Sequence, residues 1–463
     1  MAPKFGTSGL RGLVIELTES LVADYTRAFL AACNCNGTLY VGRDLRPSSP
    51  DIADAVMSVA RAEGVAVVDC GALPTPALAL ASMQTNAGAV MVTGSHIPAD
   101  RNGLKFYVPG GEITKVDEQA IIAHLGRPVA DETGTLKTAP DVIDTYERRY
   151  TDAFGADALH GLRVGVYQHS AVGRDVIVRV VQALGAQPVT LGRSDVFIPV
   201  DTEALDLDTR DLLAGWCKDY GLDAIISTDG DSDRPMLADH TGAIVVGDVL
   251  GVLTARYLGA DVICTPVSSN SMVLQMVDFK QIKLTRIGSP FVIAAMEDVL
   301  ALDPAAKVAG YEANGGFLLG FTAQMQHAPL APLMTRDSLL PMIAPLVAAG
   351  RNGCAVADLV ADLPRVFTAA GRLQGIAPQV SEPFLDRLTT DPMVRTAFFD
   401  VGGGETGIDT TDGLRVTFVG GDVIHLRPSG NAPEFRCYAE AGSAGKAADL
   451  VARHLVRLDD ILR

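Results

Sequence analysis

Hydrophobic positions along the chain alternate between short apolar runs and longer segments with helical spacing. Residues 38–71, 161–192 and 262–288 each contain a short apolar run, a polar or glycine-containing turn, a helix-like stretch and a second short run. Apolar residues at helical spacing between β-branched runs indicate strand, helix, strand units. The pattern therefore predicts α/β sheets with parallel or mixed strands. The units recur about every hundred residues, which favours repeated domains over a solenoid with a period of roughly 20 to 50 residues.

The last part of the chain follows a different pattern. Residues 396–430 alternate short strand-like runs with turns, and helical spacing returns over residues 445–462. An antiparallel sheet with a helix or two is the simplest structure for such a segment. The sequence thus predicts a smaller α+β unit here. Softer breaks in the pattern fall near residue 141, at 247–251 and at 363–365.

Length and composition indicate a soluble globular protein with several cores. The 463 residues are 48% hydrophobic and 20% charged, and a chain of this length should divide into roughly three or four domains. No stretch approaches the ~20 apolar residues that span a bilayer. The first residues, MAPKFGTSGLRG, resemble no secretion or organelle signal, and the seven cysteines show no zinc-ligand pairing. We therefore expect a cytoplasmic protein with reduced, mostly buried thiols.

The net charge of −17 excludes two classes of partner. Nucleic acids and anionic membrane surfaces require an excess of lysine and arginine, so neither is expected to bind. A small anion can still bind an acidic protein where arginines and backbone amides are concentrated locally. Glycine-rich loops that contain arginine are therefore the places where a small-molecule site is expected.

The segment DAIISTDGDSDRP holds the sharpest cluster of charged residues. Asp229, Asp231 and Asp233 follow an apolar strand at every second position, and Arg234 comes next. Three neighbouring carboxylates repel one another, and Mg²⁺, which prefers oxygen ligands, would relieve the repulsion. A calcium-binding EF-hand loop does not fit, because its sixth and twelfth positions would be Arg234 and His240 in place of glycine and glutamate. A solvated acidic turn is the alternative.

Ser95 lies in the segment VMVTGSHIPADRNGLKFY, directly after an apolar run. Sites in open α/β sheets gather at such strand ends. The serine is not a hydrolase nucleophile elbow, because that motif requires glycine where this chain has Ile97. Taken alone, Ser95 is more simply a turn residue.

Two further loops have the composition of anion sites. The segment FGTSGLRG combines glycines and small hydroxyl residues with Arg11. The segment LRPSGNAPEFR can hold a phosphate through backbone amides and paired arginines. A plain turn is the alternative for each loop. The candidate residues of the second loop are Arg427, Ser429, Gly430, Asn431 and Arg436.

Two glycine-rich segments need separate interpretations. In GYEANGGFLLG, Glu312 and Asn314 could hydrogen-bond sugar hydroxyls. Gly402, Gly404 and Gly407 satisfy the dinucleotide pattern G-x-G-x-x-G, but a turn and a strand follow them where that site requires a helix. We therefore reject a dinucleotide site.

The ordered set of motifs resembles the α-D-phosphohexomutase family, which contains phosphomannomutases and phosphoglucomutases. FGTSGLRG, TGSHIPADRNGLK, DGDSDR, YEANGG and RPSGNAPEFR cover the whole chain. The resemblance implies three similar α/β domains with mixed sheets around a central cleft, plus a smaller α+β C-terminal domain. With the breaks noted above, the expected domains are residues 1–142 with the phosphoserine loop, 143–250 with the metal loop, 251–365 with the sugar-binding loop and 366–463 with the phosphate-binding loop.

The resemblance also implies roles for the site residues. Ser95 would be a phosphoserine that donates its phosphoryl group to the sugar, giving a 1,6-bisphosphate, and would help to bind Mg²⁺ with Asp229, Asp231 and Asp233. Arg11 and Arg234 would add positive charge. His96 and Lys105 would be candidates for proton transfer, and we favour Lys105, in company with Arg11. Glu312 and Asn314 would hold ring hydroxyls. The C-terminal group, Arg427, Ser429, Gly430, Asn431 and Arg436, would hold the phosphate that is not reacting.

The implied activity is that of a phosphomannomutase, with glucose or mannose 1,6-bisphosphate as activator and a role in nucleotide-sugar synthesis. Phosphoglucomutase or dual mannose and glucose activity is an alternative, because contacts to O3 and O4 do not distinguish sugars that differ at C2. A phosphosugar phosphatase and a catalytically silent phosphosugar-binding protein are further alternatives. The chain departs from the family's more frequent TASHNP and RPSGTEP by Gly94, Ile97, Asn431 and Ala432.

Overall fold

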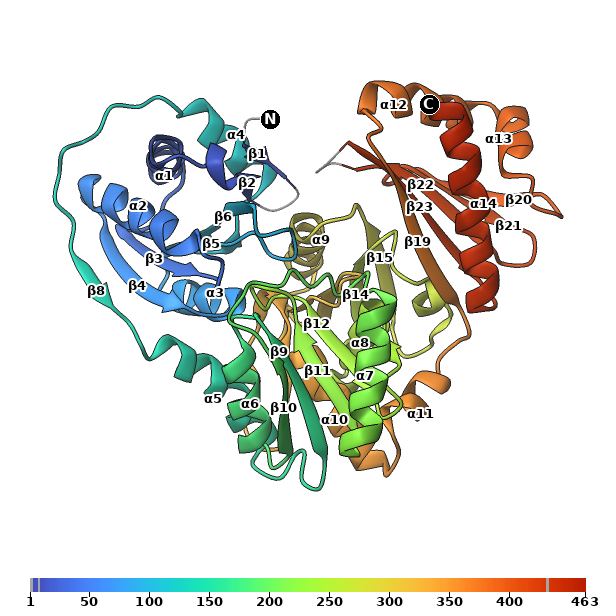
Figure 1. Ribbon diagram of the computed structural model, residues 1–463, viewed down its shortest axis with the longest axis horizontal. Coiled ribbons are helices and arrows are strands. Elements are labelled where there is room, and N and C mark those ends of the chain that lie inside the picture. Colours follow the sequence, from blue (N-terminus) through green and yellow to red (C-terminus); the bar gives the residue numbers. More distant parts are fainter. Residues whose placement is uncertain (1–2, 7–8, 430–432) are drawn as a thin grey trace.

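The computed structural model describes residues 3–6, 9–429 and 433–463. Four sheets of mixed or antiparallel strands, with helices against them, follow one another along the chain (Figure 1). The predicted fold class is confirmed. The domain boundaries at residues 142, 250 and 365 stay predictions. Among the described residues, no helix combines the length and apolar character needed to cross a bilayer, and all seven cysteines are free thiols.

The first sheet has the order β1-β2-β6-β5-β3-β4-β8, with β7 paired to β6. Every residue of β5 is buried, because helices cover both faces. Val90 and Val92 pack in one core with residues of α1 and α2, whereas Ala89 and Met91 pack in another with residues of α3, as the alternation of side chains along a strand requires. The strands are β1 (Lys4–Phe5), β2 (Leu10–Leu13), β3 (Thr38–Arg43), β4 (Ala66–Ala72), β5 (Gly88–Val92), β6 (Arg101–Val108), β7 (Gly111–Glu112) and β8 (Leu136–Thr138), and the helices are η1 (Val14–Glu16), α1 (Glu19–Ala32), α2 (Ser49–Ala62), α3 (Thr75–Gln84) and α4 (Lys115–Ala123).

The second sheet has the order β10-β9-β11-β12-β13. β10, β9 and β11 are parallel, and an antiparallel hairpin joins β11 to β12. The residues of β11 are all buried, since Ala224 and Ile226 belong to the large core and Ile225 packs with residues of α7. The elements are α5 (Val142–Phe154), β9 (Arg163–His169), α6 (Arg174–Ala183), β10 (Gln187–Arg193), α7 (Leu207–Tyr220), β11 (Ala224–Thr228), β12 (Pro235–Asp239) and β13 (Ile244–Val245).

The third sheet, β15-β14-β16-β17-β18, repeats this plan. β14 pairs in parallel with β15 and with β16, and antiparallel pairings join β16 to β17 and β17 to β18. One large core extends from Tyr40 to Leu363 and joins the first three sheets, so their strand ends are held together. The elements are α8 (Gly247–Leu258), β14 (Val262–Pro266), η2 (Ser271–Gln275), β15 (Gln281–Thr285), α9 (Ser289–Leu302), β16 (Val308–Tyr311), β17 (Phe317–Leu319), β18 (Leu333–Asp337), α10 (Leu339–Asn352) and α11 (Val356–Ala361).

The fourth sheet is antiparallel, in the order β19-β23-β22-β21-β20, and has a core of its own. Its long helix α14 begins at Ala444, with the Ser443 hydroxyl as the N-cap, and ends at Leu462, close to the predicted 445–462. The strand β20 directly follows Gly404, so no helix stands where a dinucleotide site would need one. The elements are β19 (Phe367–Gln374), α12 (Pro378–Thr390), α13 (Pro392–Phe399), β20 (Glu405–Asp409), β21 (Leu414–Phe418), β22 (Val423–Pro428), β23 (Glu434–Ala441) and α14 (Ala444–Leu462).

Candidate active site

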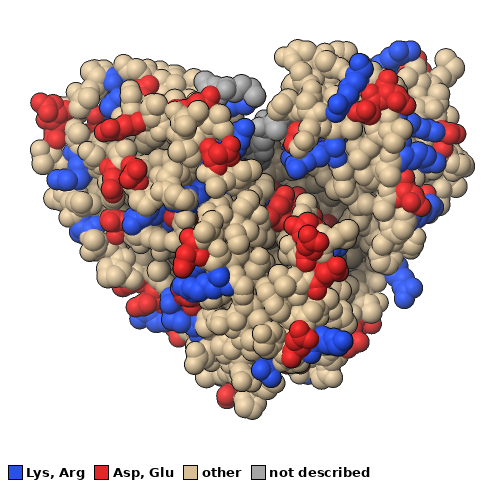
Figure 2. All heavy atoms as spheres, viewed as in Figure 1, with Lys and Arg blue, Asp and Glu red and all other residues tan. Residues whose placement is uncertain are grey.

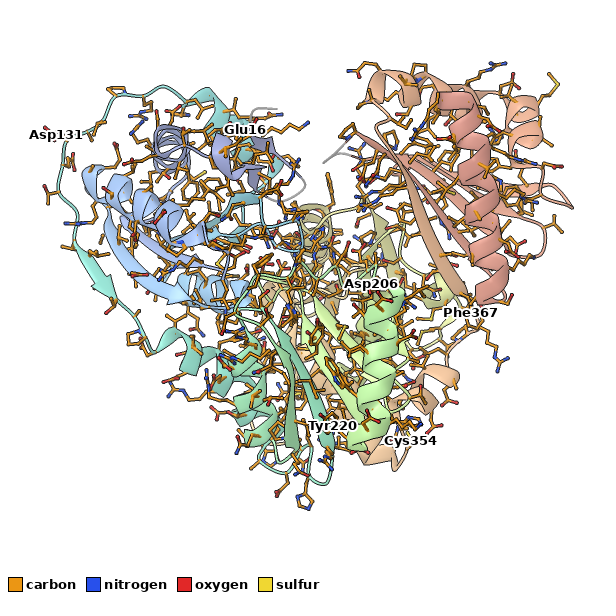
Figure 3. All side chains as sticks on the ribbon, in the orientation of Figure 1. Glu16, Asp131, Asp206, Tyr220, Cys354 and Phe367 are labelled. Atoms are coloured by element: carbon orange, nitrogen blue, oxygen red, sulfur yellow. The ribbon has the colours of Figure 1, made fainter. Side chains whose placement is uncertain are left out.

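Most candidate residues of the first three sheets lie in loops that follow buried strands, whereas Arg11 and Lys105 lie within β2 and β6. Ser95 follows β5, the three aspartates follow β11, and Glu312 follows β16. These strand ends meet in the middle of the molecule, where Figure 3 shows side chains crowded together. Figure 2 shows the surface hollowed between the lobe of the first sheet and that of the fourth. The arrangement is the one that places sites at strand ends in α/β folds.

Ser95 is fully buried and has a φ of +56°, in the left-handed region that an L residue rarely adopts. Its backbone N–H donates to the Thr93 hydroxyl at 2.8 Å. Its hydroxyl donates to Asp229 Oδ2 at 2.5 Å and lies 3.4 Å from His96 Nδ1. The serine therefore leaves β5 in a conformation that turns its oxygen towards the aspartate loop, 134 residues away in sequence.

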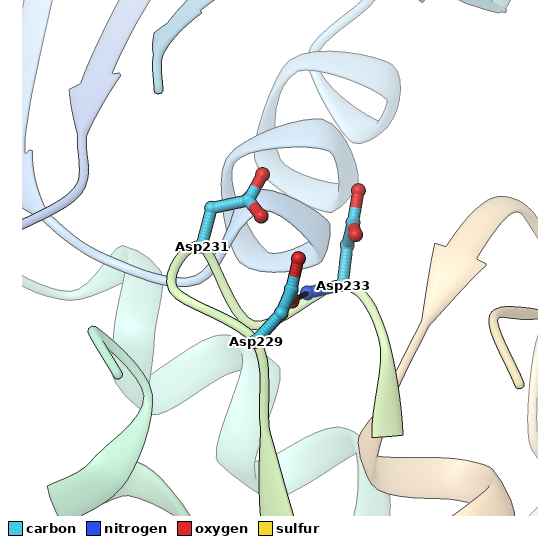
Figure 4. Close-up of side chains that lie close together, drawn as sticks. All are labelled: Asp229, Asp231 and Asp233. Atoms are coloured by element: carbon cyan, nitrogen blue, oxygen red, sulfur yellow. Dashed lines mark hydrogen bonds between the residues drawn. The ribbon is translucent and has the colours of Figure 1, made fainter. Parts of the chain in front are cut away.

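The carboxylates of Asp229, Asp231 and Asp233 are buried and point to the same side of their loop (Figure 4). One oxygen from each lies within 4.8 Å of the others. Two further oxygens, Asp231 Oδ1 and Asp233 Oδ1, are buried without a hydrogen-bond partner in the described parts of the chain. An all-oxygen, anionic donor set with unpaired atoms fits a hard divalent cation. A solvated acidic turn does not fit, because the group is not solvated.

The electrostatics of the loop agree with this interpretation. Burial, and then the charges of Asp231 and Asp233, hold the pKa of Asp229 well above its usual value. Burial also acts to raise the pKa of Asp231, but the charge and hydrogen bond of Lys105, together with hydrogen bonds to Asp229 and Thr75, outweigh it, so that this pKa lies below its usual value. Repulsion among the three carboxylates therefore disfavours their ionised forms, and a bound cation would offset it.

Lys105 and Arg336 supply fixed positive charge next to the triad. Lys105 Nζ donates to Asp231 Oδ2 at 2.5 Å and to Asp233 Oδ2 at 2.6 Å. Arg336 Nη2 lies 2.9 Å from Asp233 Oδ2. The sequence predicted Lys105 as a site residue but missed Arg336, although an arginine at the end of the buried strand β18 was a usable signal. Charges buried at such a position are rarely left without a partner.

His96 and the two predicted arginines lie around the same group. Burial, then the charge of Arg234, keeps the pKa of His96 well below its usual value, so the ring is neutral at pH 7. Burial, then Arg234, lowers the pKa of Arg11 to about 10, and Arg11 remains charged at pH 7. Arg234 Nε lies 3.9 Å from Asp233 Oδ1 and 4.0 Å from Asp229 Oδ2. The residues near Ser95 thus combine a neutral imidazole with several cations.

Glu312 and Asn314 are buried in the turn after β16. Arg336 Nη1 is 3.6 Å from Glu312 Oε2, so the same arginine connects this turn to Asp233. Burial raises the pKa of Glu312. The Asn314 side-chain oxygen accepts from the Gly316 N–H at 2.9 Å, which orients its amide. The turn therefore holds a carboxyl that Arg336 connects to the triad, and an amide with a fixed orientation.

The C-terminal candidates lie on the fourth sheet. Arg427 and Arg436 face each other directly across β22 and β23, and like charges in that position repel. Arg427 Nε donates to Asp412 Oδ1 at 2.7 Å, and Arg436 Nη2 lies 3.6 Å from Glu434 Oε2. The Ser429 N–H donates to the Glu434 carbonyl at 2.8 Å. This part of the sheet has the charge to bind an anion; Gly430 and Asn431 lie outside the described residues.

His425, on the same face of β22 as Arg427, gives a pH-dependent prediction. Its Nε2 is 2.5 Å from the Asp412 carbonyl, and burial lowers its pKa to about 4. The unfolded chain binds a proton at this histidine near pH 6.5, whereas the folded chain binds it only near pH 4. The free energy of unfolding is therefore at its full value above pH 6.5 and decreases by about 1.4 kcal/mol per pH unit as the pH falls towards 4. We expect the thermal midpoint of the C-terminal unit to fall less steeply between pH 6.5 and 4 in His425→Gln than in the unsubstituted protein. Parallel profiles would contradict this.

Comparisons with known proteins agree with the geometry. Residues 2–129 match the phosphoglucomutase/phosphomannomutase alpha/beta/alpha domain I, residues 146–242 match its domain II, and residues 354–455 match its C-terminal domain. A phosphomannomutase of Sinorhizobium fredii is 43% identical and covers 99% of each chain. A phosphomannomutase of Salmonella muenchen is also 43% identical, over 96% of this chain and 94% of its own. The crystal structure of a phosphoglucomutase/phosphomannomutase family protein from Burkholderia thailandensis superposes with a TM-score of 0.80, at 22% identity over 98% of this chain and 97% of its own.

Proposed function

Because the chain belongs to the phosphoglucomutase/phosphomannomutase family, we propose that it is a phosphomannomutase that moves a phosphate reversibly between O6 and O1 of mannose. The observation that carries the proposal is the Ser95 hydroxyl, buried and 2.5 Å from Asp229 within a triad of carboxylates. A positioned hydroxyl next to a cation site and fixed positive charges is what phosphoryl transfer requires.

The chemical step uses phosphorylated Ser95 as donor. The bond between phosphorus and Ser95 Oγ breaks as a bond forms to the free sugar hydroxyl, and the hydroxyl proton ends on Ser95 Oγ. His96 and Lys105 are the candidates to carry that proton, and we favour Lys105, with Arg11 beside it. The resulting 1,6-bisphosphate then turns and returns its other phosphoryl group to Ser95.

Asp229, Asp231, Asp233 and a phosphoserine oxygen would hold the metal ion, which we propose to be Mg²⁺. When bound, it would supply the largest local positive charge beside the transferring group. Arg234 would add to that charge, since it already lies within 4.0 Å of two of the carboxylates. Glucose or mannose 1,6-bisphosphate would activate the enzyme by phosphorylating Ser95.

The remaining candidates would bind the substrate away from the reacting end. Glu312 and Asn314 would hold the ring hydroxyls O3 and O4. The cross-strand pair Arg427 and Arg436, with Ser429, would hold the phosphate that is not reacting, because an anion between them would relieve their repulsion. Gly430 and Asn431 complete the proposed anchor. The binding energy of the remote phosphate would align the reacting end in both halves of the cycle.

The sugar preference is tested by a coupled assay with mannose 1-phosphate and glucose 1-phosphate side by side, each with a 1,6-bisphosphate activator and Mg²⁺. We expect kcat/KM to favour mannose 1-phosphate. The preference should be modest, on the order of tenfold, since the sugars differ in one hydroxyl configuration. Equal values would establish a dual-specificity enzyme, and a preference for glucose would overturn the assignment to mannose. Steady release of inorganic phosphate would instead indicate a phosphatase.

A further inference from the structure

Arg46 is a buried arginine that contacts the Ser95 loop and that none of the roles above uses. It lies between β3 and α2, is 1% exposed, and pairs with Asp44 at 3.1 Å. A guanidinium has five N–H donors in a rigid planar fork. All five are engaged, one by Asp44 and four by backbone carbonyls of the Ser95 loop. The accepting carbonyls are those of Ser95 at 2.8 Å, Ile97 at 2.6 Å, Pro98 at 2.7 Å and Arg101 at 2.9 Å.

The pair of Asp44 and Arg46 holds Ser95 from both sides. The Ser95 N–H donates to the Thr93 hydroxyl, which donates to Asp44 Oδ2 at 2.7 Å, while the Ser95 carbonyl accepts from Arg46. A residue in a rarely adopted conformation persists only where its surroundings specify it. The peptide groups on both sides of Ser95 are therefore tied to one buried ion pair, and the φ of +56° follows from it.

The aspartate loop lies against two groups that contact the same arginine, the Ser95 carbonyl and the Phe197 ring. The ring of Phe197, from the second sheet's lobe, lies 4.1 Å from the Arg46 guanidinium carbon. A Cβ added at Gly230, between Asp229 and Asp231, would come within 2.8 Å of the Ser95 carbonyl oxygen and 3.1 Å of the Phe197 ring. Arg46, the Ser95 carbonyl, Phe197 and Gly230 are thus in close contact. The guanidinium contacts both groups that separate it from the aspartate loop.

The same contacts explain Gly94, which stands at the alanine position of the TASHNP motif. A Cβ added at Gly94 would lie 2.6 to 2.8 Å from three atoms of the Arg46 guanidinium. That guanidinium cannot move aside, because its donors are all in use. In this chain, Gly94 is the residue that leaves room for Arg46 in its position.

We propose that Arg46 is a positioning residue that holds Ser95 in register with the aspartate loop, with Gly94 and Phe197 keeping its guanidinium in place. The inference rests on the proposed function, because the alignment of Ser95 with the aspartate loop serves phosphoryl transfer from Ser95. Arg46 touches no reacting atom. Its effect is on the rate of transfer, because a displacement of about 1 Å at a reacting group can cost on the order of 100-fold.

The test is Arg46→Lys, with Arg43→Lys as the matched control. Arg43 is the last residue of β3, and in the described parts of the chain its side chain makes only a partly exposed ion pair with Asp69 at 3.7 Å. Lysine keeps the charge but lacks the fork that spans four carbonyls. We expect kcat for mannose 1-phosphate to fall about 100-fold with KM changed less than about threefold. Arg43→Lys should behave as the unsubstituted protein.

A second readout separates positioning from loss of folded protein. Ser95 is phosphorylated with glucose 1,6-bisphosphate, the phosphorylated fraction is measured by intact mass, and the single-turnover rate of phosphoryl transfer to mannose 1-phosphate is measured per phosphorylated site. We expect the rate per site to fall in Arg46→Lys. If the variant instead has fewer phosphorylated molecules but an unchanged transfer rate per phosphorylated site, the proposal is overturned and Arg46 is a structural residue.

Two variants perturb Arg46 without removing it. Gly94→Ala presses on the guanidinium, and Phe197→Leu removes the ring but keeps every carbonyl contact. We expect each to lower the transfer rate per site, by on the order of tenfold for Phe197→Leu. Unchanged transfer rates in Arg46→Lys, Gly94→Ala and Phe197→Leu would overturn the inference. If the unsubstituted protein itself shows no mutase activity, the proposed function fails, and that result is independent of the comparison among variants.

Discussion

Ser95→Ala is expected to reduce kcat for mannose 1-phosphate by at least about 10⁴-fold, because the substitution removes the only oxygen that can hold the transferred phosphoryl group in the proposed cycle. A saturating 1,6-bisphosphate activator should not restore activity. The measurement is the coupled mutase assay, together with intact mass before and after incubation with glucose 1,6-bisphosphate. The unsubstituted protein should gain one phosphoryl group, and Ser95→Ala should gain none.

Ser82→Ala is the matched control for this variant. Ser82 is equally buried in the same lobe, and among the described residues its hydroxyl donates only to the Ala79 carbonyl within α3. Its removal should leave kcat near that of the unsubstituted protein. Full mutase activity in Ser95→Ala would show that another group is the nucleophile, and the assignment of the serine loop would have to be abandoned.

Removal of divalent metal is expected to lower kcat by at least about 10³-fold, because charge neutralisation supplies most of the catalysis of phosphoryl transfer. Lys105 neutralises Asp231 and Asp233 only in part, and Asp229 receives no direct ammonium contact among the described residues. The protein is treated with EDTA, desalted and assayed, then titrated with Mg²⁺. Activity should return with Mg²⁺.

Asp231→Asn tests whether the triad is the site of that effect. The variant should need a higher Mg²⁺ concentration for half-maximal activity than the unsubstituted protein. Asp239→Asn is the control, since Asp239 ends β12 of the same sheet and its carboxylate, within the described part of the chain, accepts hydrogen bonds only from Thr241 and Ala243 of its own turn. Mutase activity that persists in EDTA, or an Mg²⁺ requirement that Asp231→Asn leaves unchanged, would contradict the proposed metal site.

The periodicity of apolar residues predicted α/β sheets and a smaller α+β unit, and the family resemblance added the three similar domains and the cleft. The structure then showed that Val90 and Val92 face one core and Ala89 and Met91 the other, which explains why this strand is wholly apolar. The antiparallel C-terminal unit was recognisable because its strands alternate and its one long helix carries a regular apolar face. Both features depend on local periodicity, which the residues themselves carry.

The site was predictable where its residues are close in sequence. The spacing of Asp229, Asp231 and Asp233 was enough to predict a metal site. The composition of the loop at Arg427 was enough to predict an anion site. The spacing of residues in the sequence does not show that Arg436 lies directly opposite Arg427, because the register of β22 and β23 determines that contact. Their predicted roles are the subject of the experiments above.

The contacts that fix the position of Ser95 and its neighbours could not be predicted from the sequence. Ser95 meets Asp229 across 134 residues, Lys105 meets Asp231 across 126, and Arg46 holds the Ser95 carbonyl across 49. The first two contacts exist because separate sheets share one core, which aligns the ends of their buried strands. Arg46 and Ser95 follow neighbouring strands of one sheet, and the pairing of β3 with β5 brings them together. Local preferences place a serine and three carboxylates at the ends of strands. Packing between sheets determines that these ends meet and that Lys105 and Arg336 neutralise the carboxylates, and strand pairing within the first sheet determines that Gly94 must leave room for Arg46.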